Sequence, residues 1–159
     1  MSRSINEELV GQRLIVLPVN IKKAVAGNEL IKRCYLTEMG YYYHAANHCI
    51  NRKTGSPQYI LLYCADGKGS LIVHGNEIEL TPETYFIVPP NTPHYYQSFA
   101  EDLWSIYWVH FTGEYADLLY RRYDKQKSQQ TIPFAVINET CSVLMKFWNY
   151  WKIAFIARK

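Results

Sequence analysis

Short β-rich runs separated by turn residues extend from Arg13 to Phe111, and this pattern constrains the fold more than any other feature of the chain. The clearest run is YILLYC (59–64), which is followed by the turn sequence DGKG (66–69) and the apolar run SLIVH (70–74). Aromatic and β-branched residues favour strands, whereas Asp and Gly favour turns. The pattern therefore predicts a hairpin over residues 59–74.

Further strands follow this hairpin at a spacing of roughly 8–12 residues. Gly75 and Asn76 allow a tight turn with positive φ, and EIEL (77–80) alternates as a half-buried strand does. The apolar run YFIV (85–88) comes next. Short strands at such regular spacing are typical of antiparallel sandwiches and barrels, so the predicted fold class is mainly β.

The apolar spacing changes from that of strands to that of helices after Gly113. Residues 114–127 are predicted to form a helix, residues 132–137 a short strand, and a second helix follows the capping pair Asn138 and Glu139. In the first helix the residues at helical spacing are Tyr115, Leu118, Leu119 and Arg122. In the second, the apolar face consists of Leu144, Phe147, Trp148, Trp151 and Phe155.

The composition indicates one globular domain, because 159 residues of which 48% are hydrophobic can form a substantial core. We divide it into an N-terminal arm with a first strand (1–29), a β-barrel (30–112) and C-terminal helices (113–159). The net charge is only +3 and the cations are scattered, so a nucleic-acid surface is not expected within this chain. Four cysteines without a CxxC pair, and no apolar leader or membrane span, favour a cytoplasmic protein.

Strand periodicity places polar and aromatic side chains on one face of each of two consecutive predicted strands. His94 and Tyr96 share one face of the run HYYQS, and Ile106, Trp108 and His110 share one face of WSIYWVHF. If these faces point into a small barrel, its lumen holds polar groups that each cost about 1–3 kcal/mol when buried without a partner. A bound small molecule would supply such partners, which favours a ligand pocket. The alternative is an aromatic core whose polar tips bond to backbone or water.

A second group of candidates lies in TEMGYYYHAANHCINRKTG (37–55). His48 and Arg52 fall on one face if this segment is extended, and the guanidinium of Arg52 offers a fork of donors for sugar hydroxyls or a carboxylate. An exposed arginine beside a turn is the alternative. His44 and His48 are spaced as zinc ligands on a helix would be, but their β-rich flanks and the lack of a third ligand argue against zinc.

Catalytic motifs are missing from the sequence. It contains no GxSxG, no glycine-rich phosphate loop and no Cys–His signature. The acidic residues near the candidate strands, Glu101 and Asp102, lie in a turn where solvation is expected. The sequence therefore predicts a binding domain without a catalytic or metal site, and we expect no enzymatic activity and no cofactor.

Three motifs in this order resemble the N-terminal, cupin-type effector domain of AraC-family transcriptional regulators: YILLYCADGKGSL, FIVPPNTPHYY and WSIYWVHFTG. The resemblance covers most of the chain and implies a cupin-like, jelly-roll β-barrel that binds a small effector, often a sugar, followed by two helices that form a homodimer interface. It places the pocket arginine at Arg52, the tyrosine at Tyr96 and the tryptophan at Trp108. The complete set of expected ligand-binding residues is Thr37, His48, Arg52, His94, Tyr96, Ile106, Trp108 and His110.

Two departures from related proteins shape the expected function. Metal-dependent cupins carry an HxH motif with a glutamate in the first half of the barrel, and the corresponding segment YCADGKGSLIVHG lacks it. The missing motif argues against the alternative function, which is a metal-dependent cupin enzyme acting on a small sugar or acid. Family members also carry two helix-turn-helix units, so we expect contact with DNA only through a C-terminal domain absent from this chain. Dimerisation is expected through Leu144, Phe147, Trp148, Trp151 and Phe155, and packing of this face against the barrel of the same chain is the alternative.

Overall fold

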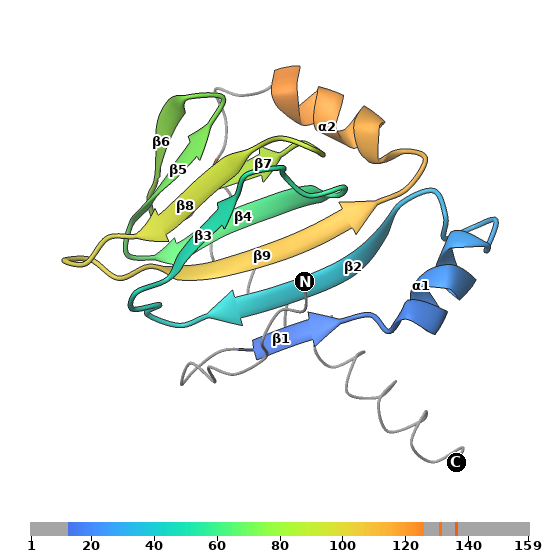
Figure 1. Ribbon diagram of the computed structural model, residues 1–159, viewed down its shortest axis with the longest axis horizontal. Coiled ribbons are helices and arrows are strands. Elements are labelled where there is room, and N and C mark those ends of the chain that lie inside the picture. The colour runs from blue at the N-terminus through green and yellow to red at the C-terminus, as the bar shows by residue number, and fades with distance from the viewer. Residues whose placement is uncertain (1–12, 126–130, 132–135, 137–159) are drawn as a thin grey trace, which may run out of the picture.

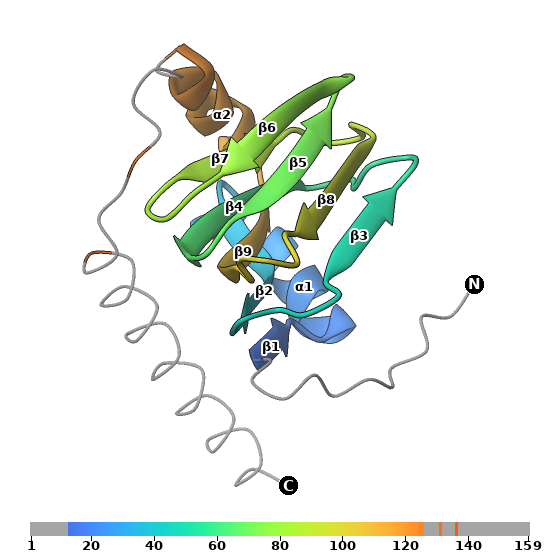
Figure 2. The same cartoon turned by 90° about the vertical axis from the view of Figure 1, so that its left-hand side faces the viewer.

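Two antiparallel β-sheets face each other in the computed structural model, which describes residues 13–125, 131 and 136 (Figures 1 and 2). One sheet has the strand order β1-β2-β9-β4-β7, and the other has the order β3-β8-β5-β6. The strands are β1 (Arg13–Val16), β2 (Tyr35–Tyr42), β3 (Cys49–Arg52), β4 (Tyr59–Asp66), β5 (Gly69–Val73), β6 (Asn76–Leu80), β7 (Tyr85–Val88), β8 (His94–Ser98) and β9 (Ser105–Thr112). The helices are α1 (Val19–Ala26) and α2 (Ala116–Lys125).

The connectivity is that of a jelly roll. From β2 to β9 the chain crosses between the sheets so that β2, β9, β4 and β7 form one sheet and β3, β8, β5 and β6 form the other, and β1 adds a strand beside β2. Cupins use this eight-stranded arrangement, in which antiparallel strands of two sheets enclose one interior. The predicted mainly β, jelly-roll fold class is therefore confirmed.

The predicted hairpin over residues 59–74 is wrong, although both of its strands exist. β4 pairs with β7 and β9, whereas β5 belongs to the other sheet and pairs with β6 and β8. Gly67, at φ +65°, turns the chain between the sheets, and a Cβ there would lie 2.3 Å from the carbonyl oxygen of Leu103. Residue alternation identifies a strand but not its partner, so a turn between sheets resembles a hairpin turn in sequence.

The next turn does form a hairpin. Val73 pairs with Asn76, so His74 and Gly75 form a two-residue loop, and their φ angles are +52° and +76°. Two positive φ angles are what the twist of a tight hairpin requires. The turn therefore begins one residue earlier than the sequence indicated.

The first C-terminal helix is confirmed as α2, but it buries a different face from the one its spacing indicated. Tyr115, Leu118 and Leu119 are exposed, whereas Ala116 and Tyr123 pack with Tyr59, Ile87 and Phe111 on the outer face of the five-stranded sheet. The backbone N–H of Ile87 donates to the Tyr123 hydroxyl at 3.3 Å, which fixes the helix to β7.

Near the termini, part of the prediction lies outside the described residues, and one helix was not predicted. The predicted strand at 132–137, apart from Val136, and the second helix with its apolar face lie outside the described residues. At the other end, α1 was not predicted; it begins after Pro18, and Lys22 on it lies 3.5 Å from the Glu38 carboxylate of β2. Neither α1 nor α2, the helices of the described region, has the length and hydropathy needed to cross a membrane.

Candidate functional site

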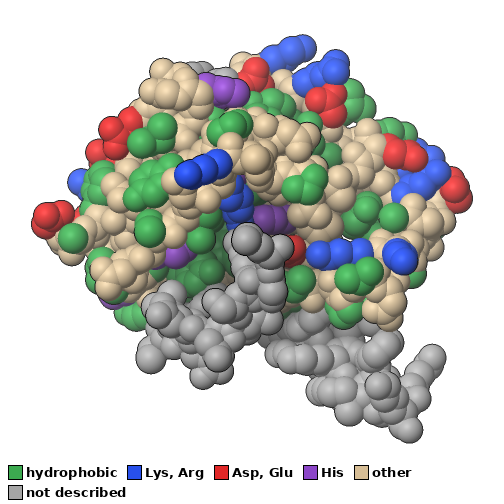
Figure 3. All heavy atoms as spheres, viewed as in Figure 1, with side chains coloured by type: hydrophobic (Ala, Val, Ile, Leu, Met, Phe, Trp, Pro, Cys, Tyr) green, Lys and Arg blue, Asp and Glu red, His purple; other side chains and the backbone are tan. Residues whose placement is uncertain are grey.

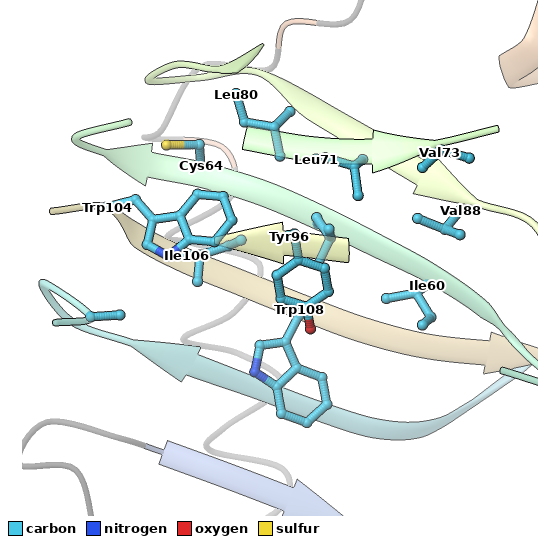
Figure 4. Close-up of a cluster of buried hydrophobic side chains, with 12 residues drawn as sticks. Ile60, Cys64, Leu71, Val73, Leu80, Val88, Tyr96, Trp104, Ile106 and Trp108 are labelled. Atoms are coloured by element: carbon cyan, nitrogen blue, oxygen red, sulfur yellow. The ribbon is translucent and has the colours of Figure 1, made fainter. Parts of the chain in front are cut away.

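The interior between the sheets is the place where the predicted site residues converge. Register pairs Trp108 of β9 with Gly40 and Leu62, and Tyr96 of β8 with Ile50 and Leu71. Since directly paired residues share a face, both aromatic side chains point into the interior. Figure 4 shows Tyr96, Trp104, Ile106 and Trp108 converging within one buried cluster.

One end of this interior is closed and aromatic. Trp104 and Ile106 are fully buried there. The segment at residues 43–48 closes this end, because the N–H of Ala45 donates to the carbonyl of Trp104 at 2.9 Å and the N–H of Ser98 donates to the carbonyl of His48 at 3.0 Å. Ile106 therefore fills the floor of the lumen and offers no polar contact.

His48 stands at this closed end with one ring nitrogen paired. Its Nδ1 accepts a hydrogen bond from the indole Nε1–H of Trp104 at 3.2 Å. Burial lowers the His48 pKa from 6.5 to about 4, so the ring is neutral at pH 7. Because Nδ1 accepts, the single proton of the neutral ring is on Nε2. Nε2–H is buried, and no described protein group accepts from it.

Trp108 carries the second unpaired donor. The residue is 8% exposed, and its Nε1–H is buried without a protein acceptor among the described residues. The indole rests on Gly40, where a Cβ would lie 2.5 Å from the ring. The Tyr42 ring is a neighbour of both donors, with its centroid 6.3 Å from Trp108 and 4.4 Å from His48.

Arg52 and His94 form a polar pair toward the opposite end. Arg52 Nη1 donates to His94 Nε2 at 3.3 Å, and His94 Nδ1–H donates to the carbonyl of Thr92 at 2.8 Å. The His94 pKa is lowered, chiefly by burial and also by the charge of Arg52, against the opposing effect of the Thr92 carbonyl. His94 is thus a neutral ring with both nitrogens engaged. No carboxylate of the described region forms an ion pair with the half-buried Arg52.

His110 and Thr37 occupy the same end of the other sheet. His110 Nδ1 lies 3.9 Å from Glu38 Oε2, and its ring meets Trp108 edge-on at a centroid distance of 5.3 Å. Thr37 is the extra residue of a β-bulge between Leu36 and Glu38, and its hydroxyl donates to the carbonyl of His110 at 3.3 Å. Thr37 therefore shapes the edge of the lumen through the backbone.

Tyr96 links the two ends. It is buried, stacks on His94 with ring planes 6° apart, and lies 5.7 Å from the His48 ring centroid. Figure 3 shows a recess on the face between β3 and β2, with apolar side chains inside it and basic and His side chains at its edge. The lumen thus has an aromatic body, unpaired donors and a cationic edge, which are features of small-molecule sites.

The structure adds three residues that sequence reasoning missed: Glu38, Gly40 and Tyr42. The signal for two of them was present, because a lone glycine within the β-rich run MGYYY indicates a close approach by another group. Gly40 and Tyr42 then share the face of β2 that meets Trp108. Glu38 belongs to the same face but follows a bulge that the sequence does not reveal.

The described region offers little for metal binding or for disulfides. No group of three or more His, Cys, Asp or Glu side chains that could hold a metal ion occurs among the residues the structure describes. His44 and His48 do not share a site, since His44 lies at the surface beside Asp66 at 3.2 Å. Cys34, Cys49 and Cys64 are free thiols, of which Cys64 is buried and the other two are exposed.

Comparisons with solved structures give low overall similarity. YhaK from Escherichia coli is 13% identical with a TM-score of 0.49, over 66% of this chain and 46% of that chain. The Cupin_2 domain of an XRE family transcriptional regulator from Enterobacter cloacae is 11% identical with a TM-score of 0.42, over 63% of this chain and 95% of that chain.

Comparisons with protein families are more specific. The MmsAB operon regulatory protein of Pseudomonas aeruginosa is 27% identical over 107 residues, which cover 65% of this chain and 34% of that protein. The chain thus matches about a third of the relative's length. A family model described as the AraC-like ligand binding domain matches residues 35–149, a span that includes β2 through α2. Because this match covers well over half of the chain, the chain belongs to the family of AraC-like ligand binding domains.

Proposed function

We propose that this chain senses a small-molecule effector for an AraC-type transcription regulator and that the effector binds in the jelly-roll lumen. The observation that carries the proposal is the pair of buried, unpaired donors, Nε2–H of His48 and Nε1–H of Trp108, beside one Tyr42 ring. Each such donor costs about 1–3 kcal/mol until an acceptor is supplied. Membership of the family and the regulatory relative support the same function.

Each residue near the lumen has a role in this proposal that matches its chemistry. Arg52 holds the polar end of the effector, and Tyr96 and Trp108 pack against its body. Thr37, His48, His94, Ile106 and His110 complete the predicted binding set. Aromatic faces suit a sugar ring, so carbohydrates and sugar acids are the first effectors to test.

The regulatory step in this proposal is thermodynamic linkage. An effector that binds one arrangement of the domain more tightly shifts the population toward it, and the shift equals the difference in binding free energy. We propose a homodimer joined through the sequence segment that carries Trp148 and Trp151, with DNA bound by a separate helix-turn-helix domain. Effector binding in the lumen then shifts the spacing of the two DNA-binding domains. This function has no catalytic step, and it belongs in the cytoplasm.

A thermal-shift screen tests the proposal. Purified protein is heated with mono- and disaccharides, uronates and other small acids, each with and without a chelator. A ligand that binds only the folded state raises the melting temperature by mass action, so a few related compounds should raise it regardless of chelator. No shift from any compound would contradict the sensor function. Loss of stability with chelator alone would favour the metal-dependent enzyme.

A further inference from the structure

We infer that the effector carries a carboxylate, together with a second acceptor group, and is not a neutral sugar; this inference rests on the proposed function. The basis is an imbalance between hydrogen-bond donors and acceptors in the lumen. In the described region, His48 and Trp108 each have a buried N–H group without a partner, and the half-buried Arg52 uses Nη1 for its bond to His94.

The donors differ in depth. Arg52 pairs in the β3–β8 register with His94, two residues along β8 from Tyr96 and away from the closed end. His48 lies at the closed end, and Trp108 lies between the ends, opposite Gly40. A ligand that satisfies them needs an anionic group at Arg52 and an acceptor farther in, with the Tyr96 and Trp108 rings against its body.

Two side-chain acceptors near the lumen, His94 and Glu38, are already engaged by other groups. His94 has no free nitrogen, because Nε2 accepts from Arg52 and Nδ1–H donates to Thr92. The Glu38 carboxylate already faces Lys22 at 3.5 Å and His110 at 3.9 Å. A hydroxyl of a neutral sugar brings a donor with each acceptor, whereas a carboxylate brings about four acceptor sites and no donor. The lumen therefore complements an acid better than a polyol.

Charge points to the same ligand class. Arg52 is half-buried and has no ion-pair partner in the described region, whereas Lys22 and Arg121 each have one and Lys32 has two. Its hydrogen bond to the neutral His94 leaves the positive charge of the guanidinium uncompensated. Arginine pairs with planar carboxylates through two parallel N–H bonds. This geometry fits a ligand carboxylate that reaches Arg52 past β3, the edge strand of its sheet.

The test uses matched probes that differ only in the acid. Binding of benzoate is compared with that of benzamide, and binding of D-glucuronate with that of D-glucose, by thermal shift and calorimetry. In at least one pair the acid should bind ten times more tightly than its neutral partner. Arg52→Gln should abolish most of that preference, since a charge-assisted bond contributes about tenfold or more. Trp108→Phe should weaken the acid severalfold while keeping an aromatic ring.

Arg122→Gln is the matched control, because Arg122 is exposed on α2 and its loss removes the same charge from the chain. It should leave acid binding unchanged. Equal or tighter binding of the neutral partner would overturn the acid inference while leaving the sensor function intact. Acid binding that survives both Arg52→Gln and Trp108→Phe would also overturn it, because the acid would then bind elsewhere. If neither acid binds, the inference fails, and if no compound of the sugar panel binds either, the sensor function fails with it.

Discussion

The indole of Trp108 occupies the space that a side chain at Gly40 would fill: a Cβ at Gly40 would lie 2.5 Å from Cζ2 of the indole and 2.8 Å from Nε1. The two residues are paired across β2 and β9. Glycine at this position therefore sets where the indole stands in the lumen.

Gly40→Ala should destabilise the fold by about 1–3 kcal/mol, because the indole or β2 must move to make room for the methyl group. Urea unfolding measures the loss. Gly27→Ala is the control, since its Cβ would meet only ordinary contacts of 3.6 and 3.8 Å at the end of α1. Equal effects of the two variants would contradict the close approach of Trp108 to Gly40.

Acidification should destabilise the domain through His48. Its pKa is about 4 in the folded state and 6.5 in the unfolded chain, so between these values the unfolded state binds more protons. Stability is therefore full above pH 6.5 and falls as the pH drops toward 4, by an amount on the order of 3 kcal/mol from this residue. The lowered pKa of His94 adds in the same direction.

The His48 contribution is measured by urea unfolding of wild type and His48→Asn at pH 7 and pH 4.5. Asparagine keeps an acceptor for Trp104 but has no proton to gain in this range. The variant should lose less stability on acidification than wild type does. An identical loss in both proteins would mean that His48 is not the titrating group.

Tyr123→Phe should weaken the attachment of α2 to β7. The change removes the hydroxyl that accepts from the buried N–H of Ile87, and leaving that donor unpaired costs about 1–3 kcal/mol. Tyr115→Phe is the control: Tyr115 also accepts a hydrogen bond, from Arg33, but at an exposed site, where the effect should stay within about 0.5 kcal/mol. Thermal unfolding compares the two, and equal stability of Tyr123→Phe and wild type would count against this attachment.

The dimer prediction rests on the sequence pattern of the segment that carries Trp151. An aromatic stripe on a helix face needs a cover, and a second subunit provides it in this proposal. Wild type should sediment as a dimer and Trp151→Glu as a monomer. A monomer in both proteins would end the dimer proposal.

Local periodicity predicted the buried faces of β8 and β9 better than it predicted the pairing of the strands. His94, Tyr96, Trp108 and His110 are buried on the faces that strand alternation assigned to them, because alternation is a property of each strand alone. The β4–β5 hairpin failed because pairing depends on distant strands. The resemblance supplied Arg52, which residue types alone did not distinguish from a surface arginine.

The remaining features of the site depend on contacts between distant residues. The hydrogen bond from Trp104 to His48 joins residues 56 positions apart and decides which His48 nitrogen carries the proton. The β-bulge at Thr37 changes the face that follows it, so strand parity could not place Glu38. The prediction of which face of α2 is buried was wrong for a related reason. Ala116 and Tyr123 pack against strands β4, β7 and β9, and the local sequence of α2 does not show which strands it will contact.

The most direct test of the account is to follow the indole N–H signals of ¹⁵N-labelled protein during titration with whichever of benzoate or D-glucuronate raises the melting temperature more. The chain has four tryptophans, and the Trp108 signal is assigned by its loss in Trp108→Phe. If the effector binds in the lumen, the Trp108 signal should shift and saturate with the calorimetric affinity, because its unpaired Nε1–H gains an acceptor. A compound that binds and stabilises the protein while the Trp108 signal stays unchanged would contradict the lumen as the effector site.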